Sequence, residues 1–352
     1  MKETNKKLNV LMIGPARTVK GGITTVVNSY FEAGLDKKVN LKYIETTNDK
    51  NIILKGFKMI KGYIDFLFNI DKYDIVHIHT ASRRSFWRKR LYINRCYKKK
   101  KKIIVHIHGG AFKNFYEESN NNRKKSIIET LNKANKIIVL SKEWKNFFGK
   151  IVDENKIEVI YNSVEVPDDF KKDFGKKRIL FLGRFDEKKG IFDLLDVMTE
   201  IAKIDSEAKL YIGSNERKEK VNKIIKEYKL NNNVEYLGWV DEKLKKKVLK
   251  EATIFVLPSY YEGMPISVLE AMAYKNIVIS TNVGGIPEII ENGYNGFLIE
   301  PGDKRMLINK LKYIFENNEI NKEISDCAFE TIKEKFNIKT NIYKLFKIYC
   351  TL

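Results

Sequence analysis

Short apolar, β-branched runs recur along the 352 residues, and a stretch with helical periodicity follows each run. Runs of this kind are typical of strands that are buried on both faces of a parallel sheet. Six lie in the first half of the chain, at 8–13, 39–45, 74–79, 102–108, 136–140 and 157–161. Six more follow, at 178–182, 209–212, 233–238, 253–258, 276–280 and 296–299. The intervening segments are long enough for crossover helices, so the pattern predicts repeated βα architecture.

A polar stretch separates the two sets of predicted strands. Residues 162–176 contain Pro167 and Gly175, are rich in charge and show no apolar periodicity. We therefore predict two doubly wound, Rossmann-like α/β domains, 1–168 and 174–336, with the carboxyl ends of their strands facing one crevice. Apolar residues at helical spacing predict a last helix at 337–352 that packs back on the first domain.

Composition indicates a globular protein made and kept in the cytoplasm. Apolar residues make up 43% of the chain, enough for a sizeable core. The three cysteines have no CxxC spacing, which argues against a disulfide framework or a structural zinc site. The N-terminal residues lack the layout of a signal peptide. No apolar run approaches the roughly 18–20 residues of a membrane span.

Positive charge is concentrated in the first half, since residues 1–170 carry +16 of the net +21. Residues 81–102 hold eleven basic residues and no acidic one, interleaved with aromatic and aliphatic residues. A solvated, lysine-rich surface explains this run, and so does a surface that meets anionic lipid or nucleic acid. Nucleic acid is disfavoured because no nucleic-acid-binding motif accompanies the charge. We predict an interfacial helix that contacts anionic lipid through Arg83, Arg84, Trp87, Arg88, Lys89 and Arg90.

The four histidines lie in two predicted strands that share an HIH pattern. Alternation places His77 and His79 on one face of their strand, and His106 and His108 on one face of theirs. A metal site is one interpretation, but no carboxylate or cysteine lies near them in sequence. We expect His77, His79 and His106 to be hydrogen-bonded core residues. His108 ends its strand before two glycines, where a crevice residue belongs.

Two glycine-containing loops are candidate anion sites. Gly21 and Gly22 open a predicted helix whose amides can face an anion, although a plain tight turn has the same pattern. The loop LGRFDEKKG at 182–190 carries Arg184 and Lys189 before another predicted helix. Two cations beside a helix N-terminus suit a phosphate or diphosphate, and the alternative is a charged surface turn.

Two carboxylates stand out in PSYYEGMPISVLEAMA, residues 258–273. Glu270 interrupts an apolar helical run, where an unpaired buried carboxylate would cost several kcal/mol. Its position suits hydrogen bonds from the two hydroxyls of a vicinal diol. Glu262 precedes the helix, next to free backbone amides that can meet an anion.

These motifs together resemble the retaining GT-B glycosyltransferases of the large family four, which includes capsule and lipopolysaccharide enzymes. The resemblance spans nearly the whole chain and rests on residues 21–22, 108–109, 183–190, 258–273 and 284–303. It is more specific in the second half, which it identifies as the donor-binding domain. The first half would then bind the acceptor.

The resemblance implies roles for individual residues. Arg184 and Lys189 would grip the donor diphosphate, and Glu270 would bind the ribose hydroxyls. Glu262 would bind the transferred sugar, and His108 would lie near the reacting centre. Further donor contacts are implied for Gly22, Trp239, Val240, Gly263, Met264 and Ile266.

The resemblance also implies an activity and partners. We expect a hexosyltransferase that uses a UDP- or GDP-sugar and a glycan or glycolipid acceptor in bacterial surface polysaccharide synthesis. The sequence contains no D-x-D triplet, so we expect neither a metal bound through that motif nor another cofactor. We expect peripheral attachment to the inner face of the cell membrane. A basic but unattached enzyme, a sugar-nucleotide epimerase or phosphorylase of similar fold, and a nucleic-acid-binding protein are the alternatives.

Overall fold

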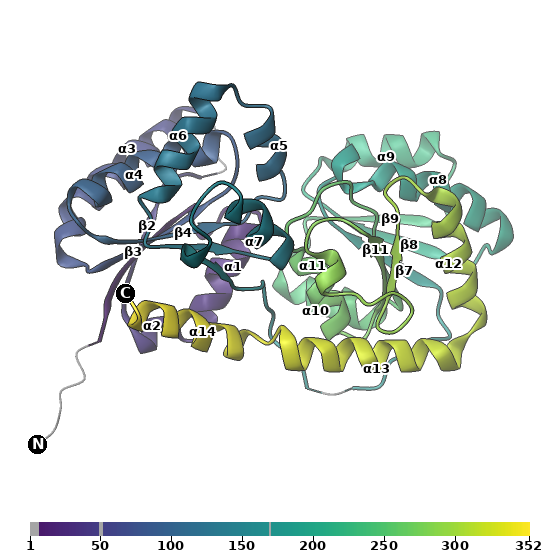
Figure 1. The fold of residues 1–352 in the computed structure, drawn as a ribbon. Helices are drawn as coiled ribbons and strands as arrows, with labels where there is room; N and C mark the ends of the chain where they lie inside the picture. Colours follow the sequence, from purple (N-terminus) through teal and green to yellow (C-terminus); the bar gives the residue numbers. More distant parts are fainter. Residues whose placement is uncertain (1–6, 49–51, 169) are drawn as a thin grey trace, which may run out of the picture. The chain divides into compact units, whose positions relative to one another are not determined.

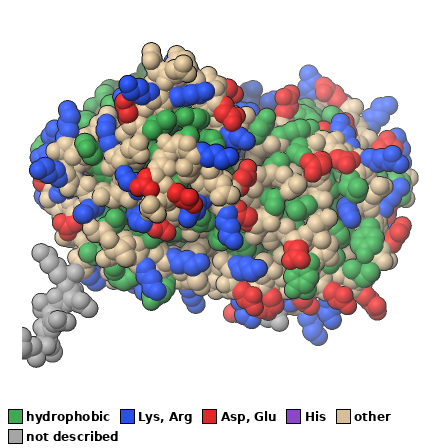
Figure 2. Space-filling model, in the orientation of Figure 1, with side chains coloured by type: hydrophobic (Ala, Val, Ile, Leu, Met, Phe, Trp, Pro, Cys, Tyr) green, Lys and Arg blue, Asp and Glu red, His purple; other side chains and the backbone are tan. Residues whose placement is uncertain are grey.

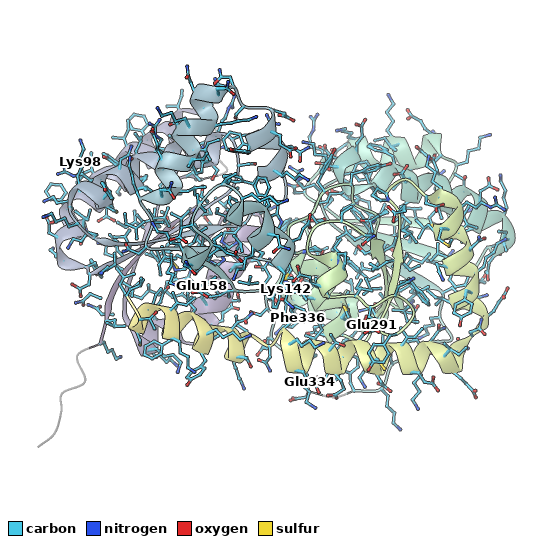
Figure 3. All side chains as sticks on the ribbon, viewed as in Figure 1. Lys98, Lys142, Glu158, Glu291, Glu334 and Phe336 are labelled. Atoms are coloured by element: carbon cyan, nitrogen blue, oxygen red, sulfur yellow. The ribbon has the colours of Figure 1, made fainter. Side chains whose placement is uncertain are left out.

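The computed structural model describes residues 7–48, 52–168 and 170–352. The chain forms two compact units: unit 1 is Met1–Ser163 with Ile338–Leu352, and unit 2 is Val164–Asn337 (Figure 1). The division falls before residue 168, the expected end of the first domain. Val164, the first residue of unit 2, donates its amide to the carbonyl of Phe336 at 3.0 Å. Figure 3 labels Phe336.

Unit 1 is built on a six-stranded sheet in the order β2-β1-β3-β4-β5-β6, and every neighbouring pair is parallel. The strands are β1 Asn9–Gly14, β2 Asn40–Glu45, β3 Ile75–Thr80, β4 Lys102–Ile107, β5 Lys136–Val139 and β6 Ile157–Val159. The helices are α1 Gly22–Glu32, α2 Leu35–Lys38, α3 Ile52–Asn69, α4 Arg84–Lys98, α5 Phe112–Glu117, α6 Asn121–Asn132 and α7 Lys142–Gly149. Figure 1 shows α3, α4 and α6 on one face of this sheet and α1 and α2 on the other.

The C-terminal helix α14, Ile338–Cys350, completes unit 1 and contacts α1 and α2. Its apolar residues Ile342, Leu345 and Tyr349 are buried. The Asn341 side-chain amide donates to the Tyr161 carbonyl at 2.7 Å, which ties the helix to the end of the first part of the chain. Helix α14 thus brings the end of the chain back to the first sheet.

Unit 2 repeats the architecture with a parallel sheet in the order β12-β11-β10-β7-β8-β9. Its strands are β7 Arg178–Leu182, β8 Lys209–Gly213, β9 Val234–Gly238, β10 Ile254–Leu257, β11 Ile277–Thr281 and β12 Phe297–Ile299. Its helices are α8 Ile191–Ile204, α9 Lys218–Glu227, α10 Glu242–Glu251, α11 Ile266–Ala273, α12 Lys304–Glu316 and α13 Asn318–Lys335. Figure 1 shows α8, α9 and α12 on one side of this sheet and α10, α11 and α13 on the other.

Each of the twelve predicted runs corresponds to one of these strands, so the expected class of two doubly wound α/β domains is confirmed. Most positions in these runs are apolar because helices cover both faces of each sheet. Every residue of β3, β10 and β11 is buried, for example. Within the described part of the chain, no helix has the length and apolar content that crossing a bilayer requires.

Candidate functional site

The candidate site of unit 2 lies where the strand order reverses. From β7 the chain proceeds outward to β8 and β9, then returns to β10 and proceeds the other way. The loops that follow β7 and β10 therefore diverge at the carboxyl ends of neighbouring strands, where ligands of open α/β sheets bind. These loops, 183–190 and 258–265, carry the predicted diphosphate and sugar residues.

Lys189 and Glu262 form an ion pair across these two loops, with Nζ 2.5 Å from Oε1. Glu262 is 9% exposed, and Lys189 is half-buried. The Asp186 side chain accepts from the Lys189 amide, and the Tyr260 amide donates to the Lys188 carbonyl at 2.9 Å. The structure therefore joins two side chains that lie far apart in the sequence, and it does so at the switch point.

Arg184 is held differently, because its guanidinium is 2.8 Å from the Asp186 carboxylate and its side chain is 62% exposed. An exposed pair between near neighbours contributes little to stability. The Arg184 guanidinium is thus available to an incoming anion, whereas the Lys189 ammonium is already paired with the nearly buried Glu262 carboxylate.

A third loop braces the segment that contains Glu262. The Gly285 amide donates to the Gly263 carbonyl at 2.6 Å. Gly284 has a φ of 56°, and a Cβ there would lie 2.1 Å from the Glu262 carbonyl oxygen. Only glycine allows this approach, which accounts for the glycine at position 284. The Thr281 hydroxyl, at the end of β11, also donates to the Ser259 carbonyl at 2.6 Å.

Helix α11 begins at Ile266, after Pro265 in an extended conformation at the N-cap. Proline is common at the first helical position, but here it precedes the helix as its N-cap. Gly263 and Met264 are buried just before the helix, and Ile266 is half-buried. The predicted amide contacts thus lie together at the N-terminus of α11, beside Glu262.

Glu270 has a partner that sequence reasoning missed. Its Oε1 is 2.6 Å from Nζ of Lys245 in α10, and both side chains are largely buried. Burial raises the pKa of Glu270, while the Lys245 charge and hydrogen bond lower it. The acid in an apolar run did signal a missing cation. Helix α10 carries five lysines, so spacing alone could not select Lys245.

The structure places Trp239 and Val240 directly after β9, at the edge of the same sheet. Trp239 is 48% exposed and Val240 is half-buried. They share the carboxyl edge of the sheet with the Lys189 and Glu262 loops, although two strands separate β9 from β10.

In unit 1 the strand order reverses between β1 and β3. Gly21 caps α1 and Gly22 opens it, as the sequence predicted. His108 follows β4 and is half-buried, with Nε2 2.8 Å from Nδ1 of His79. Burial lowers the pKa of His108 to about 3, so its imidazole is neutral near pH 7.

The other three histidines form a buried hydrogen-bonded cluster that contacts His108 through His79. His77 Nδ1 lies 2.6 Å from the Tyr349 hydroxyl of α14, and His77 Nε2 lies 3.2 Å from Nδ1 of His106. Ligand atoms of His77, His79 and His106 lie within 4.8 Å of one another, so these three residues are the described group that could hold a metal ion. Both nitrogens of His77 already have partners, and the rings of His77 and His106 stack at an interplanar angle of 11°. The arrangement suits a hydrogen-bonded core better than a metal site.

The predicted lipid-contacting set of α4 is only partly at the surface. The prediction that Lys89 contacts lipid is wrong. Lys89 is only 3% exposed, and its Nζ donates to the Thr46 hydroxyl. Helical periodicity places it with Phe86 and Tyr92 on the buried face. The remaining predicted residues are exposed or half-buried, namely Arg83, Arg84, Trp87, Arg88 and Arg90.

Trp87 and Arg90 also contact unit 1 itself. The Trp87 ring packs edge-on against Phe86 and Phe115, and the Arg90 guanidinium lies 5.6 Å from the Trp87 ring centroid. Arg83 forms an ion pair with Glu118 at 2.6 Å.

Two Rossmann-like units, with basic and acidic loops at the switch point of the second sheet, have the architecture of GT-B glycosyltransferases. Comparison with known families agrees. Residues 39–166 match the model Glycosyltransferase Family 4, and residues 164–331 match Glycosyl transferases group 1. The chain belongs to this family of glycosyltransferases.

Known proteins similar to the chain include two curated relatives. A Klebsiella pneumoniae protein described as an uncharacterized 41.2 kDa protein in the cps region is 28% identical, over 97% of this chain and 99% of that one. The Escherichia coli UDP-Gal:alpha-D-GlcNAc-diphosphoundecaprenol alpha-1,3-galactosyltransferase is 29% identical, over 90% of this chain and 84% of that one. The name of the Escherichia coli relative states a UDP-sugar donor and a diphosphoundecaprenol-linked acceptor.

The solved structure of Anabaena HepE in complex with UDP-glucose shares the fold. Its TM-score is 0.78 at 16% identity, and the match covers 97% of this chain and 99% of that one.

Proposed function

We propose that this chain is a retaining glycosyltransferase that transfers a hexosyl unit from a UDP- or GDP-sugar to a lipid-linked glycan. The product would be an intermediate of a bacterial surface polysaccharide, such as capsule or lipopolysaccharide. The observation that carries the proposal is the Lys189–Glu262 pair between two loops at the switch point, with Arg184 beside it. The E. coli relative, whose name states a UDP-sugar and a lipid diphosphate, supports the class of substrates.

The cations would stabilise the leaving group. Negative charge builds on the diphosphate as its bond to the sugar breaks. Preorganised donors aimed at that charge lower the barrier most. Arg184 and Lys189 would supply two of them, and the amides of Gly263, Met264 and Ile266 at the α11 N-terminus would supply others. No step of this scheme uses a metal ion or another cofactor.

The carboxylates would bind hydroxyl groups rather than attack carbon. Lys189 engages Oε1 of Glu262, so Oε2 can accept from a hydroxyl of the transferred sugar. Glu270 likewise offers Oε2 to the ribose, because Lys245 occupies Oε1. Trp239 and Val240 would line the base, and Gly22 would lie beside the donor phosphates. A neutral His108 can donate or accept a hydrogen bond at the sugar without adding charge.

Unit 1 would bind the acceptor. A lipid-linked acceptor requires the enzyme to work at the membrane surface, and the basic half of the chain suits its inner, anionic face. We therefore propose a cytoplasmic enzyme that attaches peripherally to the membrane and does not bind nucleic acid.

The decisive experiment measures transfer directly. Thermal stability is first screened with UDP, GDP and ADP, and sugar nucleotides of the best base are then incubated with an undecaprenyl-diphosphate-linked sugar and EDTA. A new glycosidic product with the donor's anomeric configuration supports the proposal. Epimerised donor without acceptor, donor hydrolysis alone, or an absolute need for added metal would contradict it.

A further inference from the structure

Helix α3 exposes apolar side chains along one face. Seven of its large apolar residues are between 38% and 76% exposed, namely Ile53, Leu54, Phe57, Ile60, Ile64, Leu67 and Phe68. Their spacing places most of them on a single stripe of the helix. Surface helices of globular proteins ordinarily turn such a stripe toward the core. Here it faces away from unit 1.

The opposite face of α3 fixes this orientation. Gly62 and Phe66 are buried, and a Cβ at Gly62 would lie 2.4 Å from the Glu45 carbonyl oxygen at the end of β2. Phe66 and Tyr63 both pack against Tyr92 of α4, with ring centroids 4.9 and 5.2 Å apart. The helix therefore cannot rotate its apolar stripe inward without losing this packing.

Positive charge accompanies the stripe. Lys61 is exposed on α3, and the neighbouring helix α4 exposes Arg84, Arg95 and Lys98, which helical spacing places on one face. Figure 1 shows α3 and α4 side by side, and Figure 3 shows Lys98 at the periphery of unit 1. On the side of unit 1 drawn in Figure 2, basic side chains stand among apolar ones.

We propose that α3 lies in the interface of an anionic bilayer, with its apolar stripe among the acyl chains and the α4 cations at the headgroups. An apolar helix face beside a basic one is the pattern of interfacial helices. The inference deepens the proposed membrane location and rests on it. It also moves the apolar contribution from α4, where the sequence placed it, to α3. A second copy of this chain is a poorer occupant, because like-charged α4 faces would approach each other.

The test is sedimentation of the full chain with vesicles of phosphatidylcholine, with and without phosphatidylglycerol. We expect binding that requires phosphatidylglycerol and weakens in high salt. The double variant Phe57→Ser/Ile64→Ser should bind about tenfold more weakly, because both side chains lose their burial in lipid. The control Ile204→Ser/Ile320→Ser removes two exposed apolar side chains of unit 2 and should bind like the wild type.

Two results would overturn the inference. One is absent vesicle binding, or binding that the α3 variant leaves unchanged. The other is a lipid-free dimer that the α3 variant converts to monomer, because a second copy would then cover the stripe. Transfer to a short-chain, water-soluble acceptor separates this inference from the proposed function. Sugar transfer to this acceptor should persist in the α3 variant. Absence of that transfer in the wild type would count against the glycosyltransferase proposal.

Discussion

Each acid of the unit 2 site is held by one lysine from another element. Glu262 and Lys189 have side chains 8% and 23% exposed, and Glu270 and Lys245 have side chains 16% and 17% exposed. Removing one partner of such a pair leaves an uncompensated charge away from water, which costs up to about 3–5 kcal/mol when burial is complete. Both lysines therefore stabilise the fold, and under the proposed function Lys189 would also bind the donor diphosphate.

Substitution of the two proposed diphosphate ligands should separate these contributions. Lys189→Ala should lower the free energy of unfolding by about 2 kcal/mol, because Glu262 loses its partner. Arg184→Ala should change it by less than about 0.5 kcal/mol, because that side chain is exposed. Both should weaken UDP or GDP binding about tenfold or more. Urea unfolding and calorimetric titration measure the two effects, and unchanged nucleotide affinity in both variants would refute the diphosphate assignment.

The Lys245–Glu270 pair allows a double-mutant test. Lys245→Met should destabilise the protein by about 3 kcal/mol, because it leaves the buried Glu270 carboxylate without a cation. Adding Glu270→Gln should restore most of that loss, while nucleotide binding stays weak because the ribose contact is gone. The raised pKa of Glu270 also predicts how this loss depends on pH. The loss of unfolding free energy in Lys245→Met should be smaller at low pH, where the carboxyl takes up a proton. A deficit that does not change with pH would show that the carboxylate remains solvated.

At the scale of elements, the loop after β10 owes its shape to the loop after β11. The two are joined by the amide of Gly285 and by the close approach of Gly284 to the Glu262 carbonyl. If Glu262 positions the transferred sugar as proposed, its loop needs such bracing, because small displacements of positioned groups cost rate steeply.

Gly284→Ala should therefore disturb the site as well as the fold. It combines a left-handed backbone with a contact at 2.1 Å, and we expect about 3 kcal/mol of destabilisation and a KM for donor raised about tenfold. Gly293→Ala is the matched control, since φ is 84° there but nothing lies within 4 Å of the added carbon. It should cost about 1 kcal/mol and leave KM unchanged. Equal effects of the two variants on KM would contradict the bracing role of Gly284.

Helices α3 and α4 show that sequence periodicity predicts a helix but does not by itself decide which face is buried. The basic run of α4 was visible in the sequence, but counting charges did not assign Lys89 to the buried face. That assignment depends on which face of the helix meets the sheet. For α3, apolar spacing alone would predict a stripe turned toward the core, and packing at Gly62 and Phe66 turned it outward.

For the whole molecule, the buried histidines predict how stability depends on pH. Burial lowers the pKa of His77 and His108 to about 3, and lowers those of His79 and His106 as well. Tyr349 and Tyr30 face the cluster, and Lys89 adds a positive charge near His79. None of these groups supplies the negative charge that would favour protonated histidine.

Stability should therefore fall as the pH decreases below about 6.5, because the unfolded chain takes up protons that the folded cluster excludes. Well below its unfolded-state pKa of about 6.5, each histidine contributes a slope of about 1.4 kcal/mol per pH unit. Carboxylates with ordinary pKa values near 4 take up most of their protons below about pH 5, whereas burial raises the pKa of Glu270 above its ordinary value. Urea unfolding between about pH 7.5 and 5 measures the slope of unfolding free energy against pH. His77→Gln should reduce this slope by the contribution of one histidine. A flat profile across that window would disprove neutral burial of the cluster.

The sequence by itself determined the strands, their division between two domains and the class of enzyme. Strands buried on both faces are mostly apolar, and open α/β sheets bind ligands at the loops after their strands, so both leave local signals. It also singled out Glu262, Glu270, Arg184, Lys189 and His108.

Only the tertiary structure decided which partners these residues have. It joined Lys189 to Glu262, selected Lys245 among five lysines for Glu270, assembled four histidines with Tyr349, buried Lys89 and exposed the stripe of α3. The reason is physical: local pattern reports a residue's own secondary structure, whereas ion pairing and burial depend on elements that only the folded sheet brings together.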